Sequence, residues 1–156
     1  MPSGRGFAAT TVALGTVALT HAAFTWPLYA TLAFFVGGAL VAFIAEAVVI
    51  NLNWLEHHIG PKVLGVPPYL LFGWTGTIYI AFRLALLVTD GWAAVVAAGI
   101  LATTYDVVTD HRGVEDGHWT YTDNLPGPRY RGVPWWNFVG WLVISCFTAA
   151  LAVPFL

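Results

Sequence analysis

Five apolar stretches dominate this sequence of 156 residues. A helix needs about 20 consecutive apolar residues to cross the hydrocarbon of a bilayer. Stretches of this kind occur at residues 7–23, 27–51, 67–89, 92–109 and 134–156. With 58% hydrophobic and only 9% charged residues, the chain also lies outside the range of ordinary soluble domains. We therefore predict an all-α integral membrane protein with about five transmembrane helices, forming a single domain over residues 1–156.

The first stretch has a second interpretation. Arg5, an apolar run and the small residues of HAAF, residues 21–24, also resemble a secretory signal peptide. No polar mature domain follows, however, and the next stretch begins almost at once at Trp26. The sequence therefore favours a retained span, but it does not decide whether residues 1–23 are removed.

Basic residues are distributed unequally among the connecting segments. The segments near Thr25 and Asp90 contain no Lys or Arg, whereas the N-terminus and the two long loops contain Arg5, Lys62, Arg112, Arg129 and Arg131. Because Lys and Arg are enriched on the cytoplasmic side of membrane proteins, we predict a cell-membrane protein whose N-terminus and long loops are cytoplasmic. The net charge of -2 gives no reason to expect a nucleic acid partner, and we expect the basic residues to contact membrane lipids.

One motif occurs twice. GPKVLGVPPYLLFGW at residues 60–74 and GPRYRGVPWWNFVGW at residues 127–141 both fit GPxxxGVPxxxxxGW, with an offset of 67 residues. Each copy lies where a long loop enters an apolar stretch. The sequence thus predicts two tandem helix–loop–helix hairpins, at about 27–89 and 92–156, as a parallel internal repeat. In that arrangement both long loops converge on one face of the membrane.

Three carboxylates lie inside the apolar stretches or directly beside them, close to these loops. Glu46 is near the end of the second stretch, and Asp106 and Asp110 are at the end of the fourth. An ionisable side chain at this depth is costly unless it faces the interior or a wet cavity, so all three are candidate functional residues. Asp106 and Asp110 are four residues apart and share one helix face, where two carboxyl groups can hold one proton between them.

Aromatic residues crowd the same end of the chain. Some aromatic residues there are expected simply to anchor the helices at the membrane interface. Aromatic faces also stabilise cations and can bind flat polyenes, and Asn137 and Trp141, four residues apart, can line one cleft. The candidate substrate-binding residues are Trp74, Tyr105, Trp119, Tyr121, Trp136, Asn137 and Trp141.

Histidines in the loops raise the alternative of a metal-dependent membrane oxygenase or desaturase. The adjacent His57 and His58 and the isolated His111 and His118 do not form the HxxxH or HxxHH boxes of such enzymes. We therefore predict no metal and no cofactor, and we expect most of these histidines to be solvated or to cap helices.

The second half carries a family resemblance. Its motifs are Asp106-xxx-Asp110, Gly117-x-Trp119-x-Tyr121 and Tyr130-x-Gly132-Val133-Pro134-xx-Asn137-Phe138-xx-Trp141. This pattern resembles the membrane-bound carotenoid hydratases of carotenoid biosynthesis, of the bisanhydrobacterioruberin hydratase type, which occur in archaea and some bacteria. The resemblance extends over about residues 46–141 and suggests a short or divergent member. It implies addition of water to a terminal double bond of an acyclic C50 or C40 carotenoid, without metal or redox cofactor.

Acid-catalysed hydration of such a double bond requires a proton donor, a stabilised carbocation and a directed water molecule. On this hypothesis Asp106 or Asp110 is the donor, Glu46 positions the water or accepts its proton, and the aromatic residues stabilise the cation. The competing class is a non-catalytic membrane subunit or scaffold that binds a carotenoid or lipid. A transporter ranks lowest, because the carboxylates cluster at one end. Further partners left open are a second copy of the chain and other membrane enzymes of the pathway.

Overall fold

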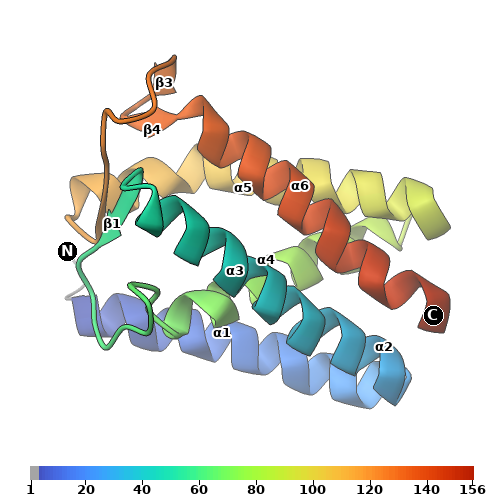
Figure 1. Cartoon of the computed structure of the whole chain (residues 1–156). Coiled ribbons are helices and arrows are strands. Elements are labelled where there is room, and N and C mark those ends of the chain that lie inside the picture. The colour runs from blue at the N-terminus through green and yellow to red at the C-terminus, as the bar shows by residue number, and fades with distance from the viewer. Residues whose placement is uncertain (1–3) are drawn as a thin grey trace.

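The structure is a computed structural model that describes residues 4–156, and it is mostly helical (Figure 1). Its helices are α1 (Gly4–Thr25), α2 (Leu28–Leu32), α3 (Gly38–Asn51), α4 (Tyr69–Ala85), α5 (Gly91–Glu115) and α6 (Trp135–Ala152). A π-helical turn, Ala33–Gly37, joins α2 to α3, and a 3-10 turn, Val153–Phe155, follows α6. The predicted helical membrane fold is confirmed.

Five long helices result, because α2, the π-helical turn and α3 run on as one rod. Within residues 4–156, four of them are long and apolar enough to cross a membrane: α1, the α2–α3 rod, α5 and α6 with its 3-10 turn. α4 has 17 residues and stops at Ala85, four residues before the predicted end of that stretch, because residues 86–88 form turns. The fifth crossing therefore stays a prediction.

The end of α5 differs from the prediction. The helix continues to Glu115 instead of stopping at residue 109, so His111 lies on a helix and not in the second loop. Gly117, whose φ is 71°, then ends it: the backbone N–H of Gly117 donates to Val114 and that of His118 to Gly113. Glycine is the residue that most easily takes this left-handed conformation after a helix. Asp110 is on the same helix as Asp106, as their spacing predicted.

α4 packs in the middle of the bundle. It contacts α1 on one side and α3, α5 and α6 on the other, while α6 also packs along α5 and against α3. α1 and α4 approach closely at Gly15 and Gly76, since a Cβ on Gly15 would overlap the backbone of Phe72. This tight packing makes α1 part of the bundle.

The two long loops form four short strands that were not predicted: β1 (Leu55–His57), β2 (Trp119–Tyr121), β3 (Arg129–Tyr130) and β4 (Val133–Pro134). β1 and β2 pair antiparallel, although they are more than 60 residues apart in the chain. We call residues 53–58 and 118–124, which this ladder joins, the cap. The cap lies at the same end of the bundle as the N-terminus (Figure 1).

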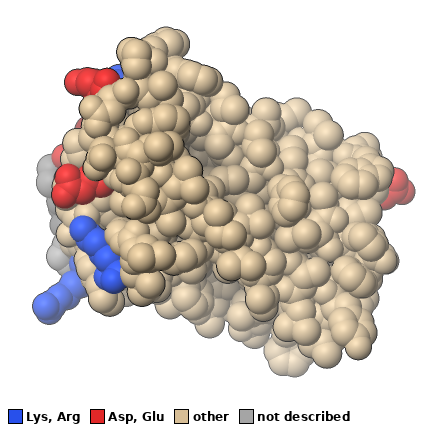
Figure 2. Space-filling model, in the orientation of Figure 1, with Lys and Arg blue, Asp and Glu red and all other residues tan. Residues whose placement is uncertain are grey.

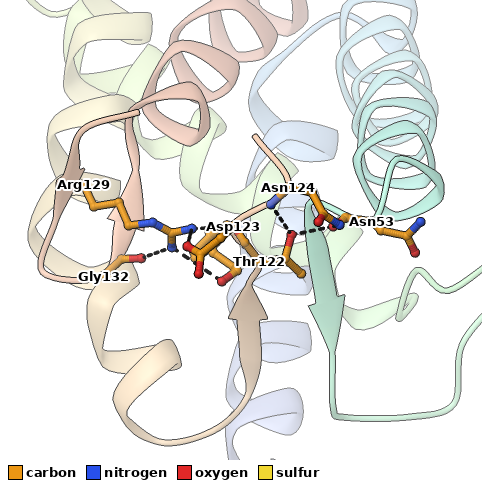
Figure 3. Close-up of polar contacts among 7 residues, drawn as sticks. Asn53, Thr122, Asp123, Asn124, Arg129 and Gly132 are labelled. Atoms are coloured by element: carbon orange, nitrogen blue, oxygen red, sulfur yellow. Dashed lines mark hydrogen bonds and ion pairs between the residues drawn. The ribbon is translucent and has the colours of Figure 1, made fainter. Parts of the chain in front are cut away.

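Polar contacts fix the edge of the cap (Figure 3). Arg129 forms an ion pair with Asp123 at 2.9 Å and donates to the backbone oxygens of Thr122 and Gly132. The side chains of Thr122 and Asn124 donate to the backbone oxygen of Asn53, which belongs to the other loop. The two loops therefore form one connected layer over the end of the helices.

Both copies of the repeated motif make the same turn. Residues 63–66 and 130–133 each close with an antiparallel pair, and their two central residues have φ of 50° and 83° in the first copy and 51° and 87° in the second. The second central residue is Gly65 or Gly132, as a positive φ favours. The turn is thus repeated in conformation, while duplication of the whole hairpins stays a prediction.

Charged side chains gather at the cap end on the face shown in Figure 2, and the flank of the bundle is almost free of them. The opposite end carries Asp90, which precedes α5. Large apolar side chains are exposed along the flank, among them Leu40, Ile44, Val96 and Ile100. An apolar belt between polar ends is what a bilayer requires.

Candidate functional site

The three predicted carboxylates come together beneath the cap. Glu46 projects from α3, and Asp106 and Asp110 project from α5. Glu46 is 8% and Asp106 3% exposed, and Asp110 is partly buried. The three are close enough to act on one another electrostatically. The interior of the bundle therefore holds an acidic cluster at its cap end.

Two different side chains hold the carboxylate of Glu46. The indole N–H of Trp74 on α4 donates to Oε1 at 2.9 Å, and Nε2 of His57 in β1 lies 3.0 Å from Oε2. Both partners are buried. Glu46 thus links α3, α4 and the cap, and its two oxygens are fixed in direction.

Asn137 holds Asp106. Its Nδ2 donates to Oδ2 of Asp106 at 2.8 Å, which joins α6 to α5 inside the bundle. Asn137 reaches this position because α6 begins at Trp135, directly after Pro134 in the repeated motif. The first copy of the motif has Leu70 at the matching place, so only the second copy supplies an amide.

Tyr121 of β2 holds Asp110. Its hydroxyl donates to Oδ2 at 2.9 Å. Burial, followed by the nearby charge of Asp110, raises the pKa of the Tyr121 phenol well above its usual range. Tyr121 therefore stays protonated near neutral pH and remains a hydrogen-bond donor.

Aromatic rings surround the acidic cluster. Trp74 and Trp141, which occupy the same place in the two motif copies, stack with centroids 3.8 Å apart and an angle of 18° between their planes. Trp136 meets Tyr121 edge-on at 5.5 Å. Trp119 packs over Gly113 of α5, where a Cβ would overlap its ring. These contacts place the predicted rings around the carboxylates.

Tyr105 is the predicted site residue that the structure does not bring into this cluster. Its side chain is 53% exposed on the outer face of α5, whereas the neighbouring Asp106 points inward. Adjacent residues of a helix lie about 100° apart around its axis, so they cannot face the same interior. Tyr105 therefore faces the belt that meets the membrane.

Comparison with known proteins identifies the family. A family model described as carotenoid biosynthesis protein matches residues 7–155, nearly the whole chain. The chain belongs to the carotenoid biosynthesis protein family. It is also 33% identical over 91 residues to a bisanhydrobacterioruberin hydratase of Haloarcula japonica. The match covers 54% of this chain and 30% of that relative, so the aligned part spans under a third of its length. No solved structure matches.

The family resemblance proposed from the second loop is thus confirmed, together with a role in carotenoid biosynthesis. The match to residues 7–155 includes α1 and both copies of the repeated motif. A membrane-embedded protein of this family fits a hydrophobic carotenoid, since its bundle presents apolar helices to lipid and rings around a polar cluster.

The expectation of solvated histidines is wrong for three of the four loop histidines. His57, His111 and His118 are each 4% exposed. His58 is exposed, and its Nε2 forms a hydrogen bond with the hydroxyl of Thr120 at 2.8 Å. Residues alternate between the two faces of a strand, so the β1–β2 ladder buries His57. Alternation in the three residues of β1 is too short a pattern to reveal this from sequence.

The histidines do not assemble a metal centre. Among residues 4–156, no group of three or more His, Cys, Asp and Glu side chains is placed to hold one ion. His57 turns its Nε2 to Glu46, and His118 packs its ring on Phe7 of α1 with centroids 4.4 Å apart. This geometry gives no support to the oxygenase alternative.

Proposed function

We propose that this protein is a carotenoid hydratase, which adds water to a terminal double bond of an acyclic C50 or C40 carotenoid. The observation that carries the proposal is that two buried carboxyl groups, Asp106 and Glu46, lie close enough to interact electrostatically, with the indole of Trp74 bonded to Glu46 and stacked on Trp141. Such a site can supply a proton, shelter a cation and take up a second proton. The name of the Haloarcula relative agrees with this chemistry.

Asp106 is the proposed proton donor. A carboxylic acid is far less costly to remove from water than a carboxylate, and Asp106 is the more buried of the two aspartates. Asn137 donates to Oδ2, which leaves Oδ1 to carry the proton. Transfer of this proton to the terminal double bond forms a new C–H bond and a tertiary carbocation. Asp110, held by Tyr121, is a second carboxyl group that can share one proton with Asp106.

Glu46 is the proposed base for the water. Water forms the C–O bond with the cation and gives one proton to the Glu46 carboxylate, so the sum is alkene plus water to tertiary alcohol. A face of the Trp74–Trp141 stack that the other ring does not cover stabilises the cation between these steps. No electron transfer occurs, and the reaction belongs to the lyase class.

We further propose that α4 completes a fifth crossing. A helix of 17 residues is about 26 Å long, close to the thickness of the hydrocarbon, and α4 packs against all four helices that are long and apolar enough to cross a membrane. The excess of Lys and Arg at the cap end supports a cytoplasmic cap and N-terminus. The matching turns and the stacked tryptophans support a parallel duplication of the two hairpins.

Pigment analysis tests the hydratase proposal. Cells that produce an acyclic carotenoid are given the intact chain, Asp106→Asn or Glu46→Gln, and their pigments are separated and weighed by mass spectrometry. The intact chain is expected to yield a more polar pigment heavier by one water, and each variant is expected to lose this product by at least about 100-fold. Asp90→Asn and Glu56→Gln are the matched controls, because both carboxylates are exposed and Glu56 lies on the face of β1 opposite to His57.

Full product with both Asp106→Asn and Glu46→Gln would refute this assignment of roles. Unchanged pigment that copurifies with the intact protein would instead support the non-catalytic carotenoid-binding alternative. The two outcomes are distinct, because the first retains the reaction and the second lacks it.

A further inference from the structure

His57 is the partner of Glu46 that the sequence did not reveal. Its imidazole is buried, with Nε2 3.0 Å from Oε2 of Glu46, while no protein atom bonds to its buried Nδ1. The backbone around it is firmly held: His57 pairs with Trp119 in the β1–β2 ladder, and Lys62 donates to the His57 carbonyl oxygen. The ring is therefore positioned by the cap and not by α3.

Only one of the two partners of Glu46 can exchange a proton with it. The indole N–H of Trp74 is a donor that neither accepts a proton nor releases one near neutral pH. An imidazole can do both, because one nitrogen takes a proton while the other gives one up. A carboxyl group buried beneath the cap consequently has His57 as its route to the cytoplasmic side.

The hydratase reaction, on which this inference rests, creates the need for such a route. In each turnover Asp106 loses a proton to carbon and Glu46 gains one from water, so the site cannot react again until both have returned to their starting states. Moving a proton through the apolar belt would require charged groups along the bundle. Charged side chains gather instead at the cap end of the bundle, and Lys62 of the first loop donates to the backbone oxygen of His57 there.

We propose that His57 is a positioning residue and proton relay that resets Glu46 after each turnover. The Glu46 carboxyl gives its proton to Nε2 of His57 as Nδ1 releases one to cytoplasmic water through the cap. Proton exchange with water then returns the ring to the tautomer with a free Nε2, so that it can accept again in the next turnover. A proton from the cytoplasmic solvent returns to Asp106, so the proton balance closes. The charged groups around the ring are Glu46 of α3, Asp110 of α5, which acts on His57 electrostatically, and Lys62 of the first loop.

Three variants test the relay in membranes that contain the enzyme. His57→Gln keeps an amide able to donate to Glu46 but cannot relay, and we expect its kcat to fall about 100-fold while KM changes little. His57→Ala is expected to fall as far and to recover with added imidazole. His58→Gln, the exposed neighbour bonded to Thr120, is the matched control and is expected to behave as the intact chain. Of these variants with glutamine, only His57→Gln should lose the limb of the pH–rate profile that the His57 imidazole supplies.

Turnover of His57→Gln at the rate of the intact chain would overturn the relay. So would a low rate in His57→Ala that imidazole cannot restore, since that pattern means the ring only fills space. If added imidazole restores turnover in His57→Ala and not in Glu46→Gln, the relay acts through the His57–Glu46 pair.

A second readout does not depend on hydratase activity. The chain has three glutamates, so carbon-13 labelling of glutamate in a Glu56→Gln and Glu115→Gln background isolates the Glu46 carboxyl band in the infrared spectrum. Membranes acidified until the Glu46 carboxyl group carries a proton are mixed with equally acidic D2O, and proton exchange at Glu46 is expected to slow at least tenfold in His57→Gln and not in His58→Gln. Equal exchange rates would refute the relay. Slowed exchange in a protein without hydratase activity would support the relay and refute only the proposed reaction.

Discussion

Replacing Asn137 with leucine tests the link between α5 and α6 most directly. Leucine already occupies the matching place, Leu70, in the first motif copy, so the backbone conformation accepts it. The change removes the 2.8 Å hydrogen bond to Asp106, whose side chain is buried. A buried polar group that loses its partner costs about 1–3 kcal/mol. The unfolding equilibrium constant should therefore rise about 5- to 150-fold.

A double-mutant cycle separates the hydrogen bond from changes in packing. Replacing both partners by apolar groups of similar shape is close to neutral, so Asp106→Leu with Asn137→Leu should be more stable than the two single changes predict together. Unfolding in mixed detergent and SDS micelles, followed by circular dichroism, gives each free energy of unfolding. If the free-energy changes of the two single variants add up to that of the double variant within about 0.5 kcal/mol, Asn137 and Asp106 are not coupled and the reasoning is refuted.

The other predictions concern the cap and the packing beneath it. Tyr121→Phe removes the donor to Asp110 and should lower the free energy of unfolding by about 1–3 kcal/mol at pH 7. Because the pKa of Tyr121 is raised in the folded state, its contribution to the free energy of unfolding is complete below about pH 10 and is lost as the pH rises further. If the free energy of unfolding of Tyr121→Phe depends on pH in the same way as that of the intact chain, this prediction is wrong. Gly113→Ala should lower the free energy of unfolding by about 1–3 kcal/mol, since the added Cβ would overlap the ring of Trp119. Gly140→Ala adds a Cβ in open space and should leave the free energy of unfolding unchanged. Equal thermal stability of the two variants would refute the packing argument.

The sequence alone determined the class of the fold and the identity of the acidic residues. Apolar runs of about 20 residues predict spanning helices whatever their neighbours are, because the bilayer fixes the length. The spacing of Asp106 and Asp110 is set by the helix itself, so their shared face followed from local geometry. Gly117 also marked the true end of α5, since its left-handed conformation is a local property, although the prediction placed that end six residues too early.

Only the tertiary structure decided which side chains face one another. In a bilayer the outward surface of a helix is as apolar as its packed surface, so hydropathy does not distinguish the interior from the lipid side. Tyr105 therefore looked equivalent to Asp106 in the sequence, yet it lies on the exposed face. The burial of His57 against Glu46 depends on pairing between strands more than 60 residues apart, and no local pattern encodes a contact of that range.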